Sequence, residues 1–295
     1  MTEVAESSRV ALKNILVATD YSPVSSRAIG FAGGLASRFD ATLYAVHAEE
    51  PINYAIPPQF WKAGRDASRV SSEQVAGMLR KCFPTVRSEM LQEDGPICEV
   101  INHAVAEKSI DLLVLGTHGR TGVPKFLLGS AAEEILRRAR CPVLTIGPRA
   151  KSWDEVSLER AEILYATDFS PEAYEAAPHA FAWAEELNAR LTLLHVMVDG
   201  ATLNLGRPLE PAEAFLHLLE RLLPPDAERR FPFQVHVERG VAAERILAAA
   251  ERLGAALIVT GAREPVGFPG AAEHLSGATL HKVIARSPCA VLSVH

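Results

Sequence analysis

The segment Ala18-Thr19-Asp20-Tyr21-Ser22-Pro23 returns later in the chain as Ala166-Thr167-Asp168-Phe169-Ser170-Pro171. The two copies lie 148 residues apart (168 − 20). The same offset relates three further pairs, namely His47 with His195, Gly129 with Gly277, and Cys141 with Cys289. Self-similarity at a fixed offset indicates a duplicated structural unit. We therefore predict two tandem domains, residues 1–150 and residues 151–295.

In the middle of the repeat the offset changes. It falls to 145, a value that relates Gly95 to Gly240 and Gly116 to Gly261. The second copy has therefore lost three residues (148 − 145), and it regains them between Gly261 and Gly277. In the first copy the matching interval is a glycine-rich segment, so the second copy has remodelled that segment.

Each copy alternates apolar runs with helical patterns. The first run, Ile15-Leu16-Val17-Ala18, is typical of a parallel strand covered on both faces. Ser22 and Pro23 then supply an N-cap residue and a proline suited to the first turn of a helix. Further strands are predicted at 41–47, 85–91, 111–116 and 142–147, with helices near 57–83, 95–108 and 130–139. The second copy repeats the strands at 162–167, 190–198, 232–238, 256–261 and 290–294. This alternation predicts an α/β fold: two open, mostly parallel five-stranded sheets with helices on both faces.

The composition is that of an ordinary globular protein, and it excludes some classes of function. A formal net charge of −6 argues against nucleic acid as a partner, because such binding needs clustered Lys and Arg. No apolar run approaches the roughly 20 residues that span a bilayer, so we expect a cytoplasmic protein with no membrane partner. The sparse cysteines show no metal-ligand spacing and suit a reducing compartment. We predict ordinary buried thiols at all four: Cys82, Cys98, Cys141 and Cys289.

A glycine-rich segment connects the predicted fourth strand of the first copy to the helix that follows. It begins Leu115-Gly116-Thr117-His118-Gly119-Arg120 and ends Gly129-Ser130-Ala131-Ala132-Glu133. Glycines let backbone N–H groups approach an anion, and the N-terminus of a helix favours negative charge. We interpret Ser130 as the helix N-cap and Glu133 as its capping-box partner. The segment predicts a phosphate cradle; the alternative is that the glycines only shape turns.

Asp20 lies just past the first predicted strand, whereas Gly116 ends the fourth. In an open parallel sheet, ligands bind at the carboxyl ends of strands where the strand order reverses. If the first and fourth strands are neighbours, Asp20 faces the glycine-rich segment and its carboxylate can accept hydrogen bonds from ribose hydroxyls. The alternative is that Asp20 only shapes a turn through the nearby backbone. Of the two, we favour the nucleotide ligand.

These residues carry a resemblance to a known family. The spacing Gly116-x2-Gly119-x9-Gly129-Ser130 matches the G-x2-G-x9-G-[ST] signature of ATP-binding universal stress proteins. Cys141-Pro142-Val143-Leu144 resembles the last strand of that family, and Thr19-Asp20 and His47 resemble the ends of its first two strands. The resemblance covers essentially the whole chain. It implies a tandem universal stress protein with a Rossmann-like fold of the HUP type.

The resemblance implies ATP as the ligand, with or without Mg²⁺. Asp20 would hold the ribose or adenine, and the backbone around Ala18 and Ala48 would flank the adenine. The glycine-rich segment would surround the ribose and phosphates. Arg120 could add a charge-assisted contact to phosphate, but it is equally a solvated loop cation. The implied binding residues are Ala18, Asp20, Ala48, Leu115, Gly116, Gly119, Arg120, Gly129, Ser130 and Ala131.

The second copy keeps only part of this pattern. Asp168 and Gly261 survive, but Glu264 stands where the second glycine is expected, and Ala278 replaces the hydroxyl of Ser130. A carboxylate inside the cradle repels phosphate, and the loss of the hydroxyl removes a donor. We therefore predict that the second copy is mainly structural and that its nucleotide loop is degenerate.

Three functions from different classes fit this sequence. We favour an ATP-binding protein with a regulatory role in the stress response. The chain contains no P-loop, and no paired carboxylates accompany the cradle, so we expect at most weak ATP hydrolysis. The alternatives are a slow ATPase and a nucleotide-free interaction scaffold. The resemblance also implies an intrachain pseudo-dimer, a homodimer of such chains and a regulatory protein partner.

Overall fold

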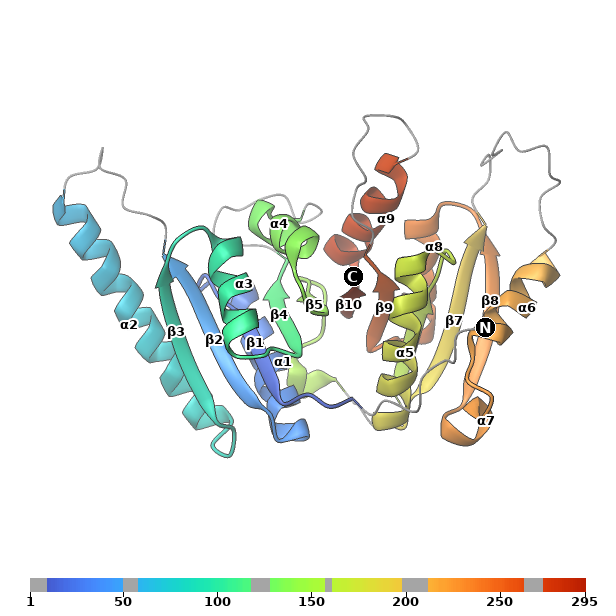
Figure 1. Ribbon diagram of the computed structural model, residues 1–295, viewed down its shortest axis with the longest axis horizontal. Coiled ribbons are helices and arrows are strands. Elements are labelled where there is room, and N and C mark those ends of the chain that lie inside the picture. The colour runs from blue at the N-terminus through green and yellow to red at the C-terminus, as the bar shows by residue number, and fades with distance from the viewer. Residues whose placement is uncertain (1–9, 50–57, 118–127, 157–160, 198–211, 263–272) are drawn as a thin grey trace. The chain divides into compact units, whose positions relative to one another are not determined.

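The computed structural model describes residues 10–49, 58–117, 128–156, 161–197, 212–262 and 273–295 (Figure 1). The chain divides into two compact units, and the change from one to the other falls between Ile146 and Gly147. We call the unit that precedes this point the first unit and the unit that follows it the second unit.

The first unit alternates strands and helices in the predicted order. Its strands are β1 (Asn14–Ala18), β2 (Thr42–Glu49), β3 (Ser88–Asp94), β4 (Leu112–Gly116) and β5 (Val143–Ile146). Its helices are α1 (Pro23–Phe39), α2 (Pro58–Cys82), α3 (Ile97–Glu107) and α4 (Ser130–Arg138). All neighbouring strands are parallel, in the order β3-β2-β1-β4-β5. The predicted α/β class and parallel sheet are confirmed.

The second unit repeats this sheet. Its strands are β6 (Glu162–Ala166), β7 (Arg190–Met197), β8 (Phe233–Arg239), β9 (Leu257–Gly261) and β10 (Ala290–Val294), all parallel in the order β8-β7-β6-β9-β10. Its main helices are α5 (Pro171–Glu186), α6 (Ala212–Leu222), α8 (Ala242–Leu253) and α9 (Glu273–Arg286). Two short helices have no predicted counterpart, η1 (Trp153–Glu155) in the join and α7 (Ala227–Arg230) before β8.

The central strands are buried on both faces, as their apolar runs predict. Ile15, Leu16 and Val17 of β1 have no exposed surface. In β6, Tyr165 stands where β1 has Val17 and is equally buried. Its hydroxyl donates a hydrogen bond to the carbonyl oxygen of Ala173 at 2.5 Å, so this buried polar atom has a partner.

In each sheet, successive strands are added toward one edge up to the third strand and toward the opposite edge after it. In the first unit the chain runs from β1 to β3 through α1 and α2, and it crosses back to β4 and β5 through α3 and α4. Because such crossovers are right-handed, the two pairs of helices cover opposite faces. Figure 1 shows α3 and α4 in front of the sheet. The predicted helices on both faces are confirmed, and the carboxyl ends of β1 and β4 form the topological switch point.

Three of the four cysteines are buried as predicted, but Cys82 is exposed. Cys82 is the last residue of α2, which packs on the edge strand β3, so part of this helix surface faces solvent. All four thiols are free. Within the described ranges, the structure contains no helix that is both long and apolar enough to cross a membrane.

Candidate functional site

The predicted neighbours β1 and β4 pair directly. The register sets Ile15 opposite Leu112 and Val17 opposite Val114, so both strands end at the same edge of the sheet. Ala18 and Gly116, each half-buried, are the last residues of these strands. The condition under which Asp20 comes near the start of the glycine-rich segment is therefore met.

The turn after β1 is held by short side-chain contacts. The carboxylate oxygen Oδ1 of Asp20 accepts from the backbone N–H of Ser22 at 3.0 Å, and the hydroxyl of Thr19 accepts from the N–H of Tyr21 at 3.0 Å. Tyr21 takes a positive φ of 63° between them. Ser22 caps α1 by accepting from the N–H of Ser25 at 3.2 Å, as predicted. The turn role that we set against a ligand role for Asp20 is thus present.

An aromatic contact supports the same turn. The ring of Tyr21 lies 4.4 Å from the ring of His47, measured between centroids. Nδ1 of His47 donates to the carbonyl oxygen of Thr19 at 2.8 Å, which fixes the tautomer because a carbonyl only accepts. The hydroxyl of Tyr21 lies 2.5 Å from that of Ser72 in α2. Sequence reasoning named His47 but missed Tyr21 and Ser72; the aromatic repeated at Phe169 was the available signal.

The two ends of the glycine-rich segment are tied together. The N–H of Thr117 donates to the carbonyl oxygen of Ile146 at 3.1 Å, which extends the ladder between β4 and β5. The N–H of Gly129 donates to the carbonyl oxygen of Thr117 at 2.9 Å. This bond brings the first turn of α4 to the carboxyl end of β4, which is the arrangement that a phosphate cradle requires.

The cap of α4 differs from the prediction. Gly129 is the N-cap residue and makes no side-chain cap, whereas Ser130 is the first helical residue. The predicted capping box between Ser130 and Glu133 is therefore wrong, because the helix begins one residue earlier than predicted and the N–H of Glu133 bonds to the carbonyl oxygen of Gly129. Ser130 and Ala131 are exposed, and their N–H groups have no partner inside the helix.

Gly116 has a packing role of its own. A Cβ built on it would lie 3.0 Å from Cγ1 of Val24 and 3.2 Å from the backbone nitrogen of Ser25. Gly129, in contrast, has φ −66° and ψ 145°, a conformation open to any residue. A Cβ at the end of β4 would therefore crowd the start of α1, whereas the backbone conformation at Gly129 is open to any residue.

The other predicted site residues fall into two groups. The side chain of Leu115 is buried in the core, so only its backbone could face a ligand, and Ala48 is half-buried near the end of β2. Gly119 and Arg120 lie outside the described residues, so their predicted roles stay predictions.

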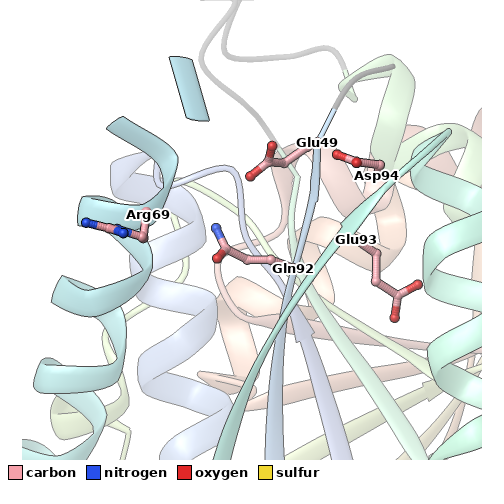
Figure 2. Close-up of a pocket in the computed structure, with 5 residues that line it drawn as sticks. All are labelled: Glu49, Arg69, Gln92, Glu93 and Asp94. Carbon is pink, nitrogen blue, oxygen red and sulfur yellow. The ribbon is translucent and has the colours of Figure 1, made fainter. Parts of the chain in front are cut away.

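A polar cavity of about 270 Å³ lies beside this edge, at the ends of β2 and β3. Figure 2 shows its lining: Glu49, Arg69, Gln92, Glu93 and Asp94. Three of these five side chains are carboxylates and only one is cationic, which disfavours an anion. This cavity contains none of the predicted nucleotide residues and is not the phosphate cradle.

The second unit preserves the turn, but the residues that match Gly129 and Ser130 do not begin a helix there. Oδ1 of Asp168 accepts from the N–H of Ser170 at 3.0 Å, and Nδ1 of His195 donates to the carbonyl oxygen of Thr167 at 2.9 Å. Helix α9 already begins at Glu273, so Gly277 and Ala278 lie inside a helix rather than at its start. The N–H groups at these positions are therefore used within the helix, unlike those at Gly129 and Ser130. Glu264 lies outside the described residues.

Aromatic side chains also fill part of the second unit's edge. The ring of Phe215 in α6 stacks on His195 at 4.4 Å, and Phe169 lies 4.8 Å from the same imidazole. Burial lowers the pKa of His195, so the imidazole stays neutral near pH 7. The described part of the second unit thus combines a preserved turn with an apolar, aromatic covering.

Together, the fold and this edge define a class: two open α/β units of the Rossmann-like kind in one chain, each with a switch point between its first and fourth strands. The family model described as the universal stress protein family matches the chain twice, at residues 11–147 and 160–295. The chain therefore belongs to the universal stress protein family and carries two of its domains in tandem. Membership of this family supports a role in the stress response.

Relatives of similar length carry the match along most of the chain. A universal stress protein of Mycolicibacterium smegmatis is 29% identical over 87% of this chain and 89% of its own length. One of Mycobacterium tuberculosis is 28% identical over 94% of this chain and 95% of its own. The crystal structure of a universal stress protein from Archaeoglobus fulgidus covers 95% of this chain and 97% of its own, with a TM-score of 0.70 at 21% identity. At that identity the structure supports the fold alone.

Proposed function

We propose that this universal stress protein binds ATP at the edge of the first unit and that nucleotide occupancy regulates its interaction with a protein partner. The observation that carries the proposal is the Gly129–Thr117 hydrogen bond of 2.9 Å, which holds the start of α4 at the end of β4. The N–H groups of Ser130 and Ala131 then offer donors for phosphate oxygens. Asp20, past the neighbouring strand, would accept from the ribose hydroxyls.

The residues present fit the triphosphate at the described end of the segment. The backbone conformation of Gly129 would accept a Cβ, so the conformation does not explain why a glycine stands there. Close approach of a phosphate to the backbone would explain it, because glycine has no Cβ to obstruct the ligand. Ser130 is exposed and adds a hydroxyl donor. Mg²⁺ would neutralise part of the phosphate charge. Gly119 and Arg120 complete the proposed site.

The second unit has a structural role in this proposal. Its helix α9 passes through the positions of Gly277 and Ala278, which removes the anion-binding helix start. We therefore propose that each chain binds one nucleotide. Residues 1–150 form the nucleotide-binding domain, and residues 151–295 form a domain with a mainly structural role. We further propose a cytoplasmic homodimer; the four free thiols suit a reducing compartment.

Calorimetric titration of ATP into the full chain tests this proposal. Bound nucleotide is first stripped from the protein and identified by mass spectrometry. The expected stoichiometry is one ATP per chain. Gly129→Ala should weaken binding by about tenfold or more by obstructing the phosphate, and Ser130→Ala by somewhat less. Gly277→Ala is the matched control, because its position lies inside α9 and alanine is a better helix former than glycine.

The outcomes separate the alternatives. Two sites per chain would contradict a structural second unit. No binding by folded, nucleotide-free protein would overturn the ATP proposal in favour of the interaction scaffold. Turnover of ATP that depends on Asp20 and Ser130 would instead identify a slow ATPase.

A further inference from the structure

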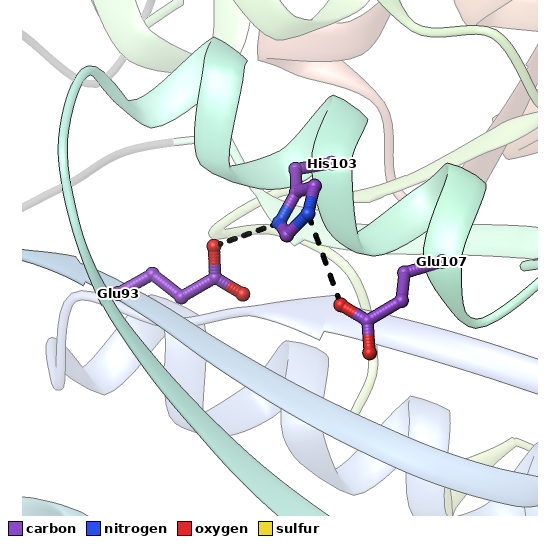
Figure 3. Close-up of side chains that lie close together, drawn as sticks. All are labelled: Glu93, His103 and Glu107. Atoms are coloured by element: carbon purple, nitrogen blue, oxygen red, sulfur yellow. Dashed lines mark hydrogen bonds and ion pairs between the residues drawn. The ribbon is translucent and has the colours of Figure 1, made fainter.

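A histidine and two carboxylates meet on the first unit, away from the proposed nucleotide residues. Glu93 comes from β3, whereas His103 and Glu107 are one turn apart on α3 (Figure 3). Nδ1 of His103 lies 3.1 Å from Oε2 of Glu93, and its Nε2 lies 3.9 Å from Oε2 of Glu107. One ligand atom from each residue lies within 4.8 Å of the others. We call these three residues the Glu-His-Glu cluster.

The carboxylate of Glu107 is already oriented by a neighbour. Nζ of Lys108 lies 3.2 Å from Oε1 of Glu107 and 3.4 Å from Oε1 of Glu89. The other oxygen of Glu107, Oε2, is the one that faces His103. An outer partner that fixes a ligating carboxylate in this way is typical of metal sites.

The second unit shows what occupies the equivalent place when the histidine is missing. With the offset of 145, Glu93 corresponds to Glu238, and Glu107 corresponds to Arg252. The register supports this match, since β2 residue His47 pairs with Gln92 as β7 residue His195 pairs with Val237.

In that unit a guanidinium nitrogen of Arg252 lies 2.7 Å from Oε1 of Glu238. The second copy therefore places a permanent cation against the strand carboxylate. The first copy has a second carboxylate at the position of this cation and adds an imidazole. The two carboxylates of the first copy lie on either side of the imidazole, Glu93 at Nδ1 and Glu107 at Nε2, so a cation bound among them would reduce their mutual repulsion.

We propose that the Glu-His-Glu cluster binds a divalent transition-metal cation of the Zn²⁺ class. Imidazole nitrogen together with carboxylate oxygen suits Zn²⁺, whereas Mg²⁺ and Ca²⁺ prefer oxygen ligands alone. Three protein ligands leave a coordination position for water or for a ligand from outside. Asp94 and Glu49, which line the adjoining cavity, add to the negative field that attracts the cation (Figure 2).

Titration of Zn²⁺ into the nucleotide-free full chain tests the site, with calorimetry and thermal unfolding as readouts. The wild type should bind one Zn²⁺ in the cluster and unfold at a higher temperature when it is bound. His103→Ala should weaken this binding by more than about tenfold. The double variant His103→Ala, Glu107→Arg copies the second unit and should fold without the site.

Two matched controls define the result. His217 is an exposed histidine with a single carboxylate, Glu220, at 3.2 Å, so His217→Ala should leave the binding unchanged. Cys82→Ser removes the exposed thiol and should also leave it unchanged. Equal Zn²⁺ binding by wild type and His103→Ala, or no binding by the wild type, would overturn the proposal. Binding of Mg²⁺ as tight as that of Zn²⁺ would overturn the assigned class of cation.

Discussion

A Cβ atom on Gly261 would lie 2.5 Å from the backbone nitrogen of Ala173, the third residue of α5. Atoms do not approach that closely without a shift of the backbone. The end of β9 is therefore packed against the first turn of α5, and the same relationship joins Gly116 to α1 with slightly more space. Packing requires the glycine at Gly261, so its presence in the second unit is no evidence for a nucleotide there.

Substitution of these glycines should destabilise the chain to different degrees. We expect Gly261→Ala to lower the free energy of unfolding by about 3 kcal/mol and Gly116→Ala by about 1 kcal/mol, because the contacts at Gly261 are tighter and are with backbone. Urea denaturation measures both. Gly30→Ala is the control, since a Cβ there meets nothing within 4 Å and alanine favours the helix. A Gly261→Ala protein as stable as Gly30→Ala would contradict the packing role.

Asp20 and Asp168 offer a matched pair for the nucleotide proposal. Each accepts a backbone N–H at 3.0 Å in the same turn, and an asparagine oxygen can accept the same bond. We expect Asp20→Asn to keep the fold and to weaken ATP binding by about tenfold, because a charged acceptor for the ribose is lost. Asp168→Asn should leave ATP affinity unchanged. If calorimetry gives the two variants equal affinities for ATP, Asp20 does not contact the nucleotide.

Two histidines of the second unit, the buried His195 and the half-buried His179, predict a loss of stability in acid. Burial lowers the pKa of His195 and of His179 below their ordinary value of 6.5. On acidification the unfolded chain takes up these protons first, so the stabilisation is present above pH 6.5 and is lost as the pH falls through the lowered values. His195→Asn keeps a donor near Nδ1 and should reduce the slope of unfolding free energy against pH. An unchanged slope would assign the effect to other groups.

The cysteines should react at very different rates with a thiol reagent. The thiolate is the reactive form, and burial raises the pKa of Cys98 and Cys289 to about 11 and that of Cys141 to about 12. Cys82 is exposed. We expect one fast-reacting thiol in the native chain, absent in Cys82→Ser, and three more only after unfolding. Peptide mapping of the labelled protein identifies them, and fast labelling of Cys141 would contradict this description of the core.

The predicted elements agree with the structure where the local signal was strong. The run Ile15-Leu16-Val17-Ala18 and the pair Ser22-Pro23 specify a strand end and a helix start from their own residues, and both lie where predicted. The start of α4 was misplaced, because Ser130 looks like an N-cap in isolation whereas the bond from Gly129 to Thr117 fixes the cap one residue earlier. That bond joins residues on either side of a loop, so no local pattern contains it.

The duplication, the parallel α/β class and the family could be predicted from the sequence, because apolar runs and the glycine signature are formed by residues close together in the chain and the repeat by matching spacings. The surroundings of each candidate group became known only from the folded structure. It assigned the turn bond to Asp20, placed Gly277 inside α9, exposed Cys82 and brought Glu93 from a strand to His103 on a helix. These relationships depend on crossovers and helix packing between distant segments, and their distances are set by the folded sheet rather than by neighbouring residues.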